Sequence, residues 1–242
     1  REYWFRVPTE YENGVLTIQH TPREDSVYYA YFAPYTMERH LDFIAAANQS
    51  TRVNYERLGA TLDGQDMDLL HISADTDSTP SNTEKKKPIW VIARQHPGES
   101  MAEWWMEGLV DRLLDEDDPI SREMLKVADF YIVPNMNPDG SRRGHLRTNA
   151  CGANLNREWI GASMERSPEV YLVREKMKQT GVDFCLDVHG DEALPYNFIA
   201  GGEGIASWND RHQLLLDLYK DTLARISPDF QTEHGYPVDP PN

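Results

Sequence analysis

The sequence predicts an α/β protein with a doubly wound, mixed but mostly parallel sheet and helices on both faces. Two observations carry this prediction. From residue 53 onward, short apolar stretches of strand character alternate with stretches whose apolar residues recur at helical spacing. Two apolar stretches, 88–95 and 182–188, each lead into a histidine. Ligands of doubly wound sheets collect at the carboxyl ends of strands, so a site is expected there.

The first 33 residues have the pattern of short strands, with Tyr, Val, Ile and Thr between turn residues such as Asn13-Gly14. Strands are predicted at 2–8, 14–20 and 27–33. Pro34 interrupts this pattern. The chain begins as a strand already under way and ends in a loop, so we expect it to be a segment of something longer at both ends.

A helix and a hairpin come next. Thr36 is a candidate N-cap for a helix that runs to about residue 48, with Leu41, Ile44 and Ala45 on one face. Asp63-Gly64 joins two strand-like runs as a hairpin turn would. These runs cover 53–62 and 66–73.

The remaining elements alternate between strand and helix. A polar loop at 78–84 precedes the apolar strand 88–95. Ser100 and Glu103 have the spacing of a capping box for a helix whose periodic residues are Met101, Trp105, Leu109 and Leu113. Ser167-Pro168 predicts another helix start and Gly181 its end. The other predicted elements are a helix at 119–127 and strands at 129–133 and 182–188.

Composition limits the possible partners. Forty acidic against 24 basic residues give a formal charge of −16, which disfavours nucleic acid, because its binding needs a basic surface. No apolar run approaches the roughly 20 residues of a membrane helix, and no signal peptide opens the chain. Cys151 and Cys185 do not form a disulfide framework. A cytoplasmic protein is predicted, and the sequence gives no oligomeric state.

The sequence His96-Pro97-Gly98-Glu99 follows the buried strand 88–95. Proline biases His96 toward an extended conformation, and Gly98 permits a turn that brings Glu99 back toward the same point. The strand 182–188 ends at His189, the strongest candidate for a third ligand. Two histidines and a carboxylate are a usual ligand set of catalytic zinc. The remaining histidines are expected to be structural or solvent-facing: His20, His40, His71, His145, His212 and His234.

The long turn-rich stretch from residue 135 to 160 contains two further motifs, one at Arg147 and one at Asn156-Arg157. An arginine beside an asparagine suits a substrate carboxylate, because the guanidinium binds it through two hydrogen bonds and the amide adds another. A second arginine nearby could polarise a scissile carbonyl. The alternative is a surface loop held by arginine side chains, and the spacing alone does not separate the two.

These motifs, in this order, resemble the zinc carboxypeptidase family, and specifically its cytosolic carboxypeptidase branch. The resemblance spans about residues 34–200 and rests on His96-Pro97-Gly98-Glu99, Asn137-Pro138-Asp139-Gly140, Asn154-Leu155-Asn156-Arg157 and Asp187-Val188-His189-Gly190. It implies the fold of that family for residues 34–242, incomplete at the C-terminal end. Residues 1–33 would be the end of a preceding β-sandwich domain.

The resemblance also assigns roles. It implies that His96, Glu99 and His189 hold one zinc ion, and that Asn156 and Arg157 bind the C-terminal carboxylate of a peptide or protein substrate. Arg147 would stabilise the oxyanion as a metal-activated water attacks the last peptide bond. The expected function is therefore that of a zinc-dependent metallocarboxypeptidase.

Two departures from the family pattern stand out. Asn154 occupies a position where many members carry an aspartate that orients a ligand histidine, and an amide supports a metal-bound imidazole less strongly. The general-base glutamate and the capping tyrosine of the family come from late in the domain, and we expect them beyond residue 242. Glu192 is a conceivable substitute for the base, although a solvated loop residue is favoured. A chain complete at residue 242 would have very low hydrolytic activity.

Two other functions remain open. A related zinc enzyme that deacylates N-acyl amino acids shares the spacing of the metal ligands. A metal-binding or peptide-binding module without a general base would share the site but not the reaction. The motifs at residues 137–140 and 154–157 favour the peptidase.

Overall fold

The computed structural model describes residues 3–74 and 85–237 and divides into two units, 1–190 and 191–242. Each unit is described by itself. The polar loop predicted at 78–84 and the end of the chain from 238 onward lie outside the described residues. None of the helices in the described part combines the length and the apolar character needed to cross a bilayer.

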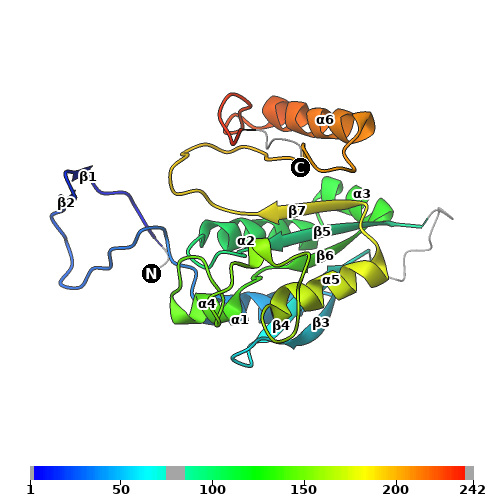
Figure 1. Cartoon of the computed structure of the whole chain (residues 1–242), viewed down its shortest axis with the longest axis horizontal. Helices are drawn as coiled ribbons and strands as arrows, with labels where there is room; N and C mark the ends of the chain where they lie inside the picture. The colour runs from blue at the N-terminus through cyan, green and yellow to red at the C-terminus, as the bar shows by residue number, and fades with distance from the viewer. Residues whose placement is uncertain (1–2, 75–84, 238–242) are drawn as a thin grey trace. The chain divides into compact units, whose positions relative to one another are not determined.

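The first unit contains a five-stranded mixed sheet (Figure 1). Its β5–β6 and β5–β7 pairs are parallel, and its β3–β4 and β4–β6 pairs are antiparallel. The predicted mixed α/β class is confirmed, with parallel pairing confined to half of the sheet. The strands, in order across the sheet, are β3 (Val53–Ala60), β4 (Asp66–Ile72), β6 (Ala128–Val133), β5 (Lys87–Ala93) and β7 (Phe184–Val188).

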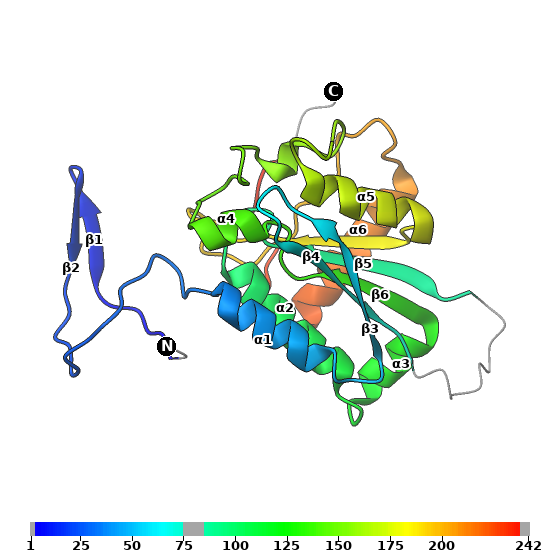
Figure 2. The ribbon, with the colours of Figure 1, turned by 90° about the horizontal axis from the view of Figure 1, so that it is seen from below.

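Helices cover both faces of this sheet (Figure 2). Side chains alternate across a strand, so Val91 packs with α1, α2 and α3 while its neighbour Trp90 packs with α5. This double coverage makes the strands apolar on both sides, as the sequence of β5 shows. The helices are α1 (Met37–Ala47), α2 (Met101–Leu114), α3 (Pro119–Val127) and α5 (Pro168–Thr180).

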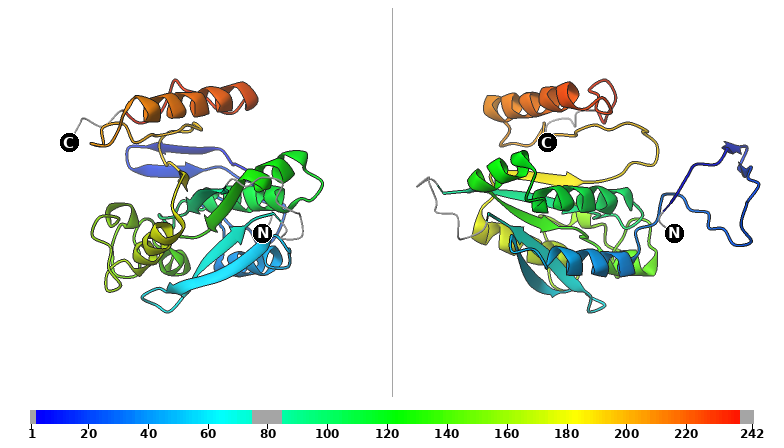
Figure 3. Two further views of the ribbon diagram at one scale, coloured as in Figure 1. Left: turned by 90° about the vertical axis from the view of Figure 1, so that its right-hand side faces the viewer. Right: turned by 180° about the vertical axis from the view of Figure 1, so that it is seen from behind.

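Several local signals give the predicted element. Thr36 accepts a hydrogen bond from the backbone of Arg39 and begins α1. Asp63-Gly64 turns the β3–β4 hairpin, and Gly64 has φ +79°. Gly181, with φ +81°, ends α5 before β7, which is the yellow strand at the sheet edge opposite β3 (Figure 3).

The predicted apolar face of α1 is right only at Ile44, which packs against the core. Leu41 is 61% exposed and Ala45 is also exposed, whereas His40, Phe43 and Ala47 are buried. The reason is a polar residue in the core: His40 is only 1% exposed and bonds Glu103 and Asp68. A pattern based on apolar residues alone cannot place a buried histidine.

The predicted capping box at the start of α2 is also wrong. Ser100 already has helical backbone angles and makes no side-chain cap bond; its hydroxyl donates to the carbonyl of Ala33 at 2.8 Å. Glu103 is fully buried and pairs with Arg94 at 2.6 Å. The helix buries Leu113 as predicted, but it also buries Met106 and leaves Trp105 46% exposed, so its buried face is only partly the predicted one.

At the N-terminal end, one of the three predicted strands, 14–20, is found, and it belongs to a short hairpin. It joins β1 (Thr9–Glu12) to β2 (Val15–Ile18) through Asn13-Gly14, both with positive φ. Residues 3–8 and 27–33 are not strands.

The second unit contains α6 (Asp210–Ile226), capped by Asn209, and an isolated bridge between Asn197 and Phe230. The rings of Tyr196 and His234 stack within this unit at 4.1 Å. Apolar side chains of α6, among them Leu214, Leu218 and Ile226, are more than half exposed.

Candidate metal centre

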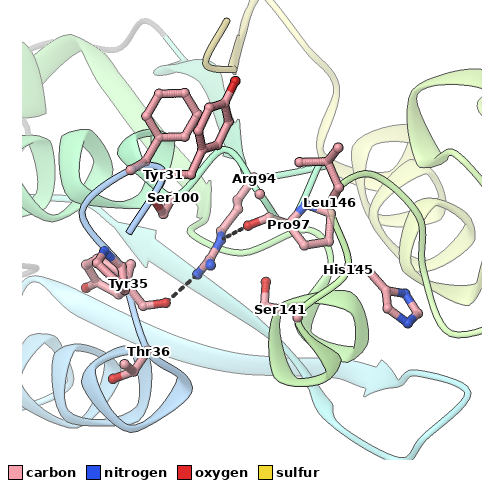
Figure 4. Close-up of a pocket in the computed structure, with 13 residues that line it drawn as sticks. Tyr31, Tyr35, Thr36, Arg94, Pro97, Ser100, Ser141, His145 and Leu146 are labelled. Atoms are coloured by element: carbon pink, nitrogen blue, oxygen red, sulfur yellow. Dashed lines mark hydrogen bonds between the residues drawn. The ribbon is translucent and has the colours of Figure 1, made fainter. Parts of the chain in front are cut away.

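The chain leaves the sheet at Arg94. β5 ends at Ala93, two residues earlier than predicted, because Arg94 has φ +58°. This conformation costs a non-glycine residue about 1–2 kcal/mol. The buried guanidinium offsets that cost by donating to the carbonyls of Pro97 (3.0 Å) and Tyr35 (2.9 Å) and to Glu103 (2.6 Å); the first two bonds are dashed in Figure 4.

The ligand turn, residues 96–99, folds over this arginine. The amide of Glu99 donates to the carbonyl of His96 at 3.1 Å, and the amide of Gly98 donates to the carbonyl of Leu146 at 2.9 Å. Gly98 is not in the left-handed region, so the expected reason for glycine is wrong. A Cβ at Gly98 would lie 2.8 Å from the Leu146 oxygen. Close backbone approach is therefore what requires glycine. A cavity of about 380 Å³ lies beside the turn, with Leu146 in its lining (Figure 4).

The structure brings His96, Glu99 and His189 together. Their possible ligand atoms all lie within 4.8 Å of one another. The Nδ1 atoms of His96 and His189 lie 2.7 and 2.8 Å from the two carboxylate oxygens of Glu99. His96 and Glu99 are each 3% exposed, and the His189 side chain is 26% exposed. The centre is thus buried on one side and accessible on the other.

The electrostatics of the centre favour a positive charge. Burial would raise the pKa of Glu99, but hydrogen bonds from His189 and His96 outweigh it and lower the pKa to about 2. Burial would lower the pKa of His189, but hydrogen bonds to Asp187 and Glu99 raise it to about 10. The positive charge that the Glu99 and Asp187 carboxylates favour can come either from a proton on His189 or from a metal cation between these groups.

Outer partners hold both imidazoles by the nitrogen that faces away from Glu99. His96 Nε2 lies 3.0 Å from Asn154 Oδ1, which also accepts from the backbone N–H of Asn156 at 3.1 Å. His189 Nε2 lies 3.0 Å from Asp187 Oδ2. Since both partners accept, each Nε2 donates, and each Nδ1 is left to bind a metal. Three converging ligands, with both imidazoles held by Asn154 and Asp187, fit zinc.

The motif at residues 137–140 supports the ligand turn from below. The Asn137 amide donates to the carbonyl of Gln95 at 3.0 Å and caps α4 (Pro138–Arg143) through Gly140. Gly140 lies so close to Pro97 that a Cβ would come within 2.4 Å of its ring. Asp139, fully buried, accepts from the Thr61 hydroxyl and the backbone of Asp63.

The three predicted substrate residues flank segments that contact the ligand turn. Arg147 follows Leu146, is exposed, and forms no hydrogen bond or ion pair with the described residues. Asn156 and Arg157 belong to the short 3-10 helix η1 (Leu155–Arg157), directly after Asn154. One guanidinium N–H of Arg157 donates to the carbonyl of Asn156 at 2.7 Å. The remaining donors of both arginines are available to a ligand.

Other residues play parts that sequence reasoning missed or left undecided. Three residues outside the predicted motifs form hydrogen bonds at the site. Arg94 donates to the carbonyl of Pro97, Gln95 donates to Asp187, and Trp159 donates to Gln95. Asp187, two residues before His189, bonds it through Oδ2. Glu192, the possible substitute for the general base, is an exposed residue of the second unit, and its place there assigns it no role.

Residues 37–198 match the family model described as zinc carboxypeptidase. The chain belongs to the zinc carboxypeptidase family. Residues 1–32 match the model of the cytosolic carboxypeptidase N-terminal domain. The resemblance seen in the sequence and the predicted class of fold are therefore confirmed, and the family's metal is zinc.

Among relatives of this chain, an uncharacterized protein of Zymomonas mobilis is 54% identical over 241 residues, 100% of this chain and 61% of its own. The metallo-carboxypeptidase of Burkholderia cenocepacia is 48% identical with a TM-score of 0.94, over 100% of this chain and 63% of its own. That of Pseudomonas aeruginosa, in complex with (2-guanidinoethylmercapto)succinic acid, is 46% identical with a TM-score of 0.91, over 99% and 62%. The chain spans about three-fifths of their length.

Proposed function

We propose that this protein is a zinc-dependent metallocarboxypeptidase that hydrolyses the C-terminal peptide bond of peptides or proteins. One observation carries the proposal: His96, Glu99 and His189 converge with both Nδ1 atoms on Glu99. The guanidinium of Arg147, which has no partner in the described part of the chain and lies one residue from the contact with the ligand turn, adds a group for the substrate.

His96, Glu99 and His189 would hold the zinc ion, and Asn154 and Asp187 would orient the two imidazoles. Zinc, when bound, polarises the scissile carbonyl and lowers the pKa of water toward neutrality. The burial of His96 and Glu99 keeps water from competing for their hydrogen bonds.

Asn156 and Arg157 would bind the terminal carboxylate of the substrate, and Arg147 would stabilise the negative charge on the scissile carbonyl oxygen. A relative's complex with a succinic acid derivative supports carboxylate recognition, since that ligand carries two carboxyl groups. The charge of −16 gives no long-range attraction to polyglutamate tails.

We also propose that residues 1–33 are the end of an N-terminal β-sandwich domain and that 34–242 belong to the catalytic domain. The separate matches of residues 1–32 and 37–198 to two family models support this boundary. The location in the cytoplasm stays a prediction.

The metal site is tested by elemental analysis of the purified protein. We expect one zinc per chain, loss of most of it in His96→Ala, and no change in His212→Ala, an exposed histidine of α6. Equal zinc in the wild type and His96→Ala would remove His96 from the ligand set.

The reaction is tested with peptides that carry free or amidated C-termini and with N-acyl amino acids. We expect cleavage of the free-ended peptides alone, lost in Arg157→Leu and retained in Arg142→Leu, which removes an exposed arginine of α4. Preference for acyl amino acids would indicate the deacylase. In a protein extended past residue 242, full zinc binding with no hydrolysis of either would indicate a non-catalytic module.

A further inference from the structure

Gln95 lies between Arg94 and the metal ligand His96 and is fully buried. Both ends of its side-chain amide are bonded. The oxygen accepts from the indole N–H of Trp159 at 3.0 Å, and the nitrogen donates to Asp187 Oδ2. Its backbone carbonyl accepts from Asn137 at 3.0 Å. A buried amide with this many partners has a single orientation.

The chemistry of the partners fixes that orientation. An indole N–H can only donate, so the amide oxygen of Gln95 must face Trp159 and its NH₂ must face Asp187. The Asp187 carboxylate then accepts from Gln95 and from His189 Nε2, which lies 3.0 Å away. Donation therefore runs in one direction from Trp159 to Asp187. His189 must carry a proton on Nε2, and Nδ1, which faces Glu99, is the nitrogen that a metal can take in place of a proton.

Asp187 depends on this arrangement for its position. Both of its hydrogen bonds fall on Oδ2, while Oδ1 is buried and has no partner among the described residues. If the Gln95 amide turned over, its oxygen would face the carboxylate, and two acceptors would repel each other. Trp159 opposes the same rotation, because the NH₂ of the turned amide would face the indole N–H.

We propose that Gln95 and Trp159 are positioning residues that hold Asp187, and through it His189, in the orientation required of a zinc ligand. The inference rests on the proposed role of His189 as a ligand. Trp159 also lies two residues after Arg157, and its carbonyl accepts from Arg174 at 2.6 Å, which fixes the backbone of this loop. One indole thus joins the loop of the carboxylate-binding residues to the metal centre.

The test compares zinc affinity, by competition with a chelator, in the wild type, Trp159→Phe and Gln95→Met. Loss of an outer partner of a metal-bound histidine typically costs 10–100-fold in affinity. We expect a loss of about tenfold in Trp159→Phe and somewhat more in Gln95→Met. The absorption spectrum of the Co²⁺-loaded protein should change in both variants, which a general loss of stability would not cause.

Trp208→Phe is the matched control, because its indole N–H also donates to a glutamine oxygen, that of Gln213 at 3.1 Å. We expect unchanged zinc affinity there. Normal affinity and an unaltered Co²⁺ spectrum in folded Trp159→Phe and Gln95→Met would overturn this inference while leaving the proposed function intact. If the wild type bound no zinc, or if His189→Ala bound it normally, the ligand assignment itself would fail.

Discussion

Replacing Asn154 with aspartate tests how the outer shell tunes the metal centre. Asn154 Oδ1 accepts from His96 Nε2 at 3.0 Å and from the backbone of Asn156 at 3.1 Å. Aspartate has the same shape and keeps both bonds. A hydrogen bond to a charged group contributes about 2 kcal/mol against about 1 kcal/mol for a neutral one. The gain of about 1 kcal/mol predicts zinc binding about fivefold tighter in Asn154→Asp.

The assay is chelator competition at fixed pH and ionic strength. Asn154→Ala leaves the Nε2 proton of His96 without its partner and should weaken zinc binding by roughly 10–100-fold. Asn54→Asp adds the same charge at an exposed position of β3 and should leave the affinity nearly unchanged. Zinc affinity that is equal or weaker in Asn154→Asp, with Asn154→Ala also unchanged, would refute the assigned contact.

Two further predictions concern the ligand turn and the core. Gly98→Ala places a Cβ 2.8 Å from the Leu146 oxygen, so it should lower the free energy of unfolding by about 1–3 kcal/mol and weaken zinc binding. Gly108→Ala is the control, because it has open space in α2 and should be neutral or stabilising. Equal effects of the two substitutions would contradict the packing argument. Burial would lower the pKa of His40, but hydrogen bonds to Asp68 and Glu103 outweigh it and raise the pKa to about 9. A pKa that is higher in the folded than in the unfolded state stabilises the fold at pH values below the unfolded-state pKa. This stabilisation is lost as the pH rises through the folded-state pKa, so the free energy of unfolding should fall by up to about 3 kcal/mol between about pH 6.5 and 9. Urea denaturation at several pH values should show that the free energy of unfolding depends less on pH in His40→Gln than in the wild type. The same pH dependence in both proteins would contradict the pairing of His40 with Asp68 and Glu103.

Local signals were enough to predict most elements that position the site. The Thr36 cap and the Asp63-Gly64 turn act through neighbouring backbone atoms, so the sequence around them shows what they do. Ser100 carries the same kind of signal and does not cap, because Glu103 is taken by Arg94 and His40. The buried ion pair between Arg94 and Glu103 outweighs a helix cap at the surface. The residues next to Glu103 in the sequence give no sign of this pair.

The same distinction applies within the site. His96 and Glu99 are three residues apart, and Pro97 and Gly98 between them predict the turn. Gln95 bonds Asp187 from 92 residues away, and Arg94 bonds Tyr35 from 59 residues away. Their roles depend on which segments the fold brings together. The positive φ of Arg94, which ends β5, likewise has no local signal, since glycine is the residue expected at such an angle.

The contact between Asp139 and the β3–β4 turn bears on how fast a bound metal could leave. Thr61 and the backbone of Asp63 hold Asp139, and Gly140 next to it lies against Pro97 of the ligand turn. For the ligand turn to swing away, this clamp at the end of the hairpin must open first. Metal dissociation then becomes a local unfolding event, and its rate should follow the hydrogen exchange of the amides around Gly140. Thr61→Val would speed both together.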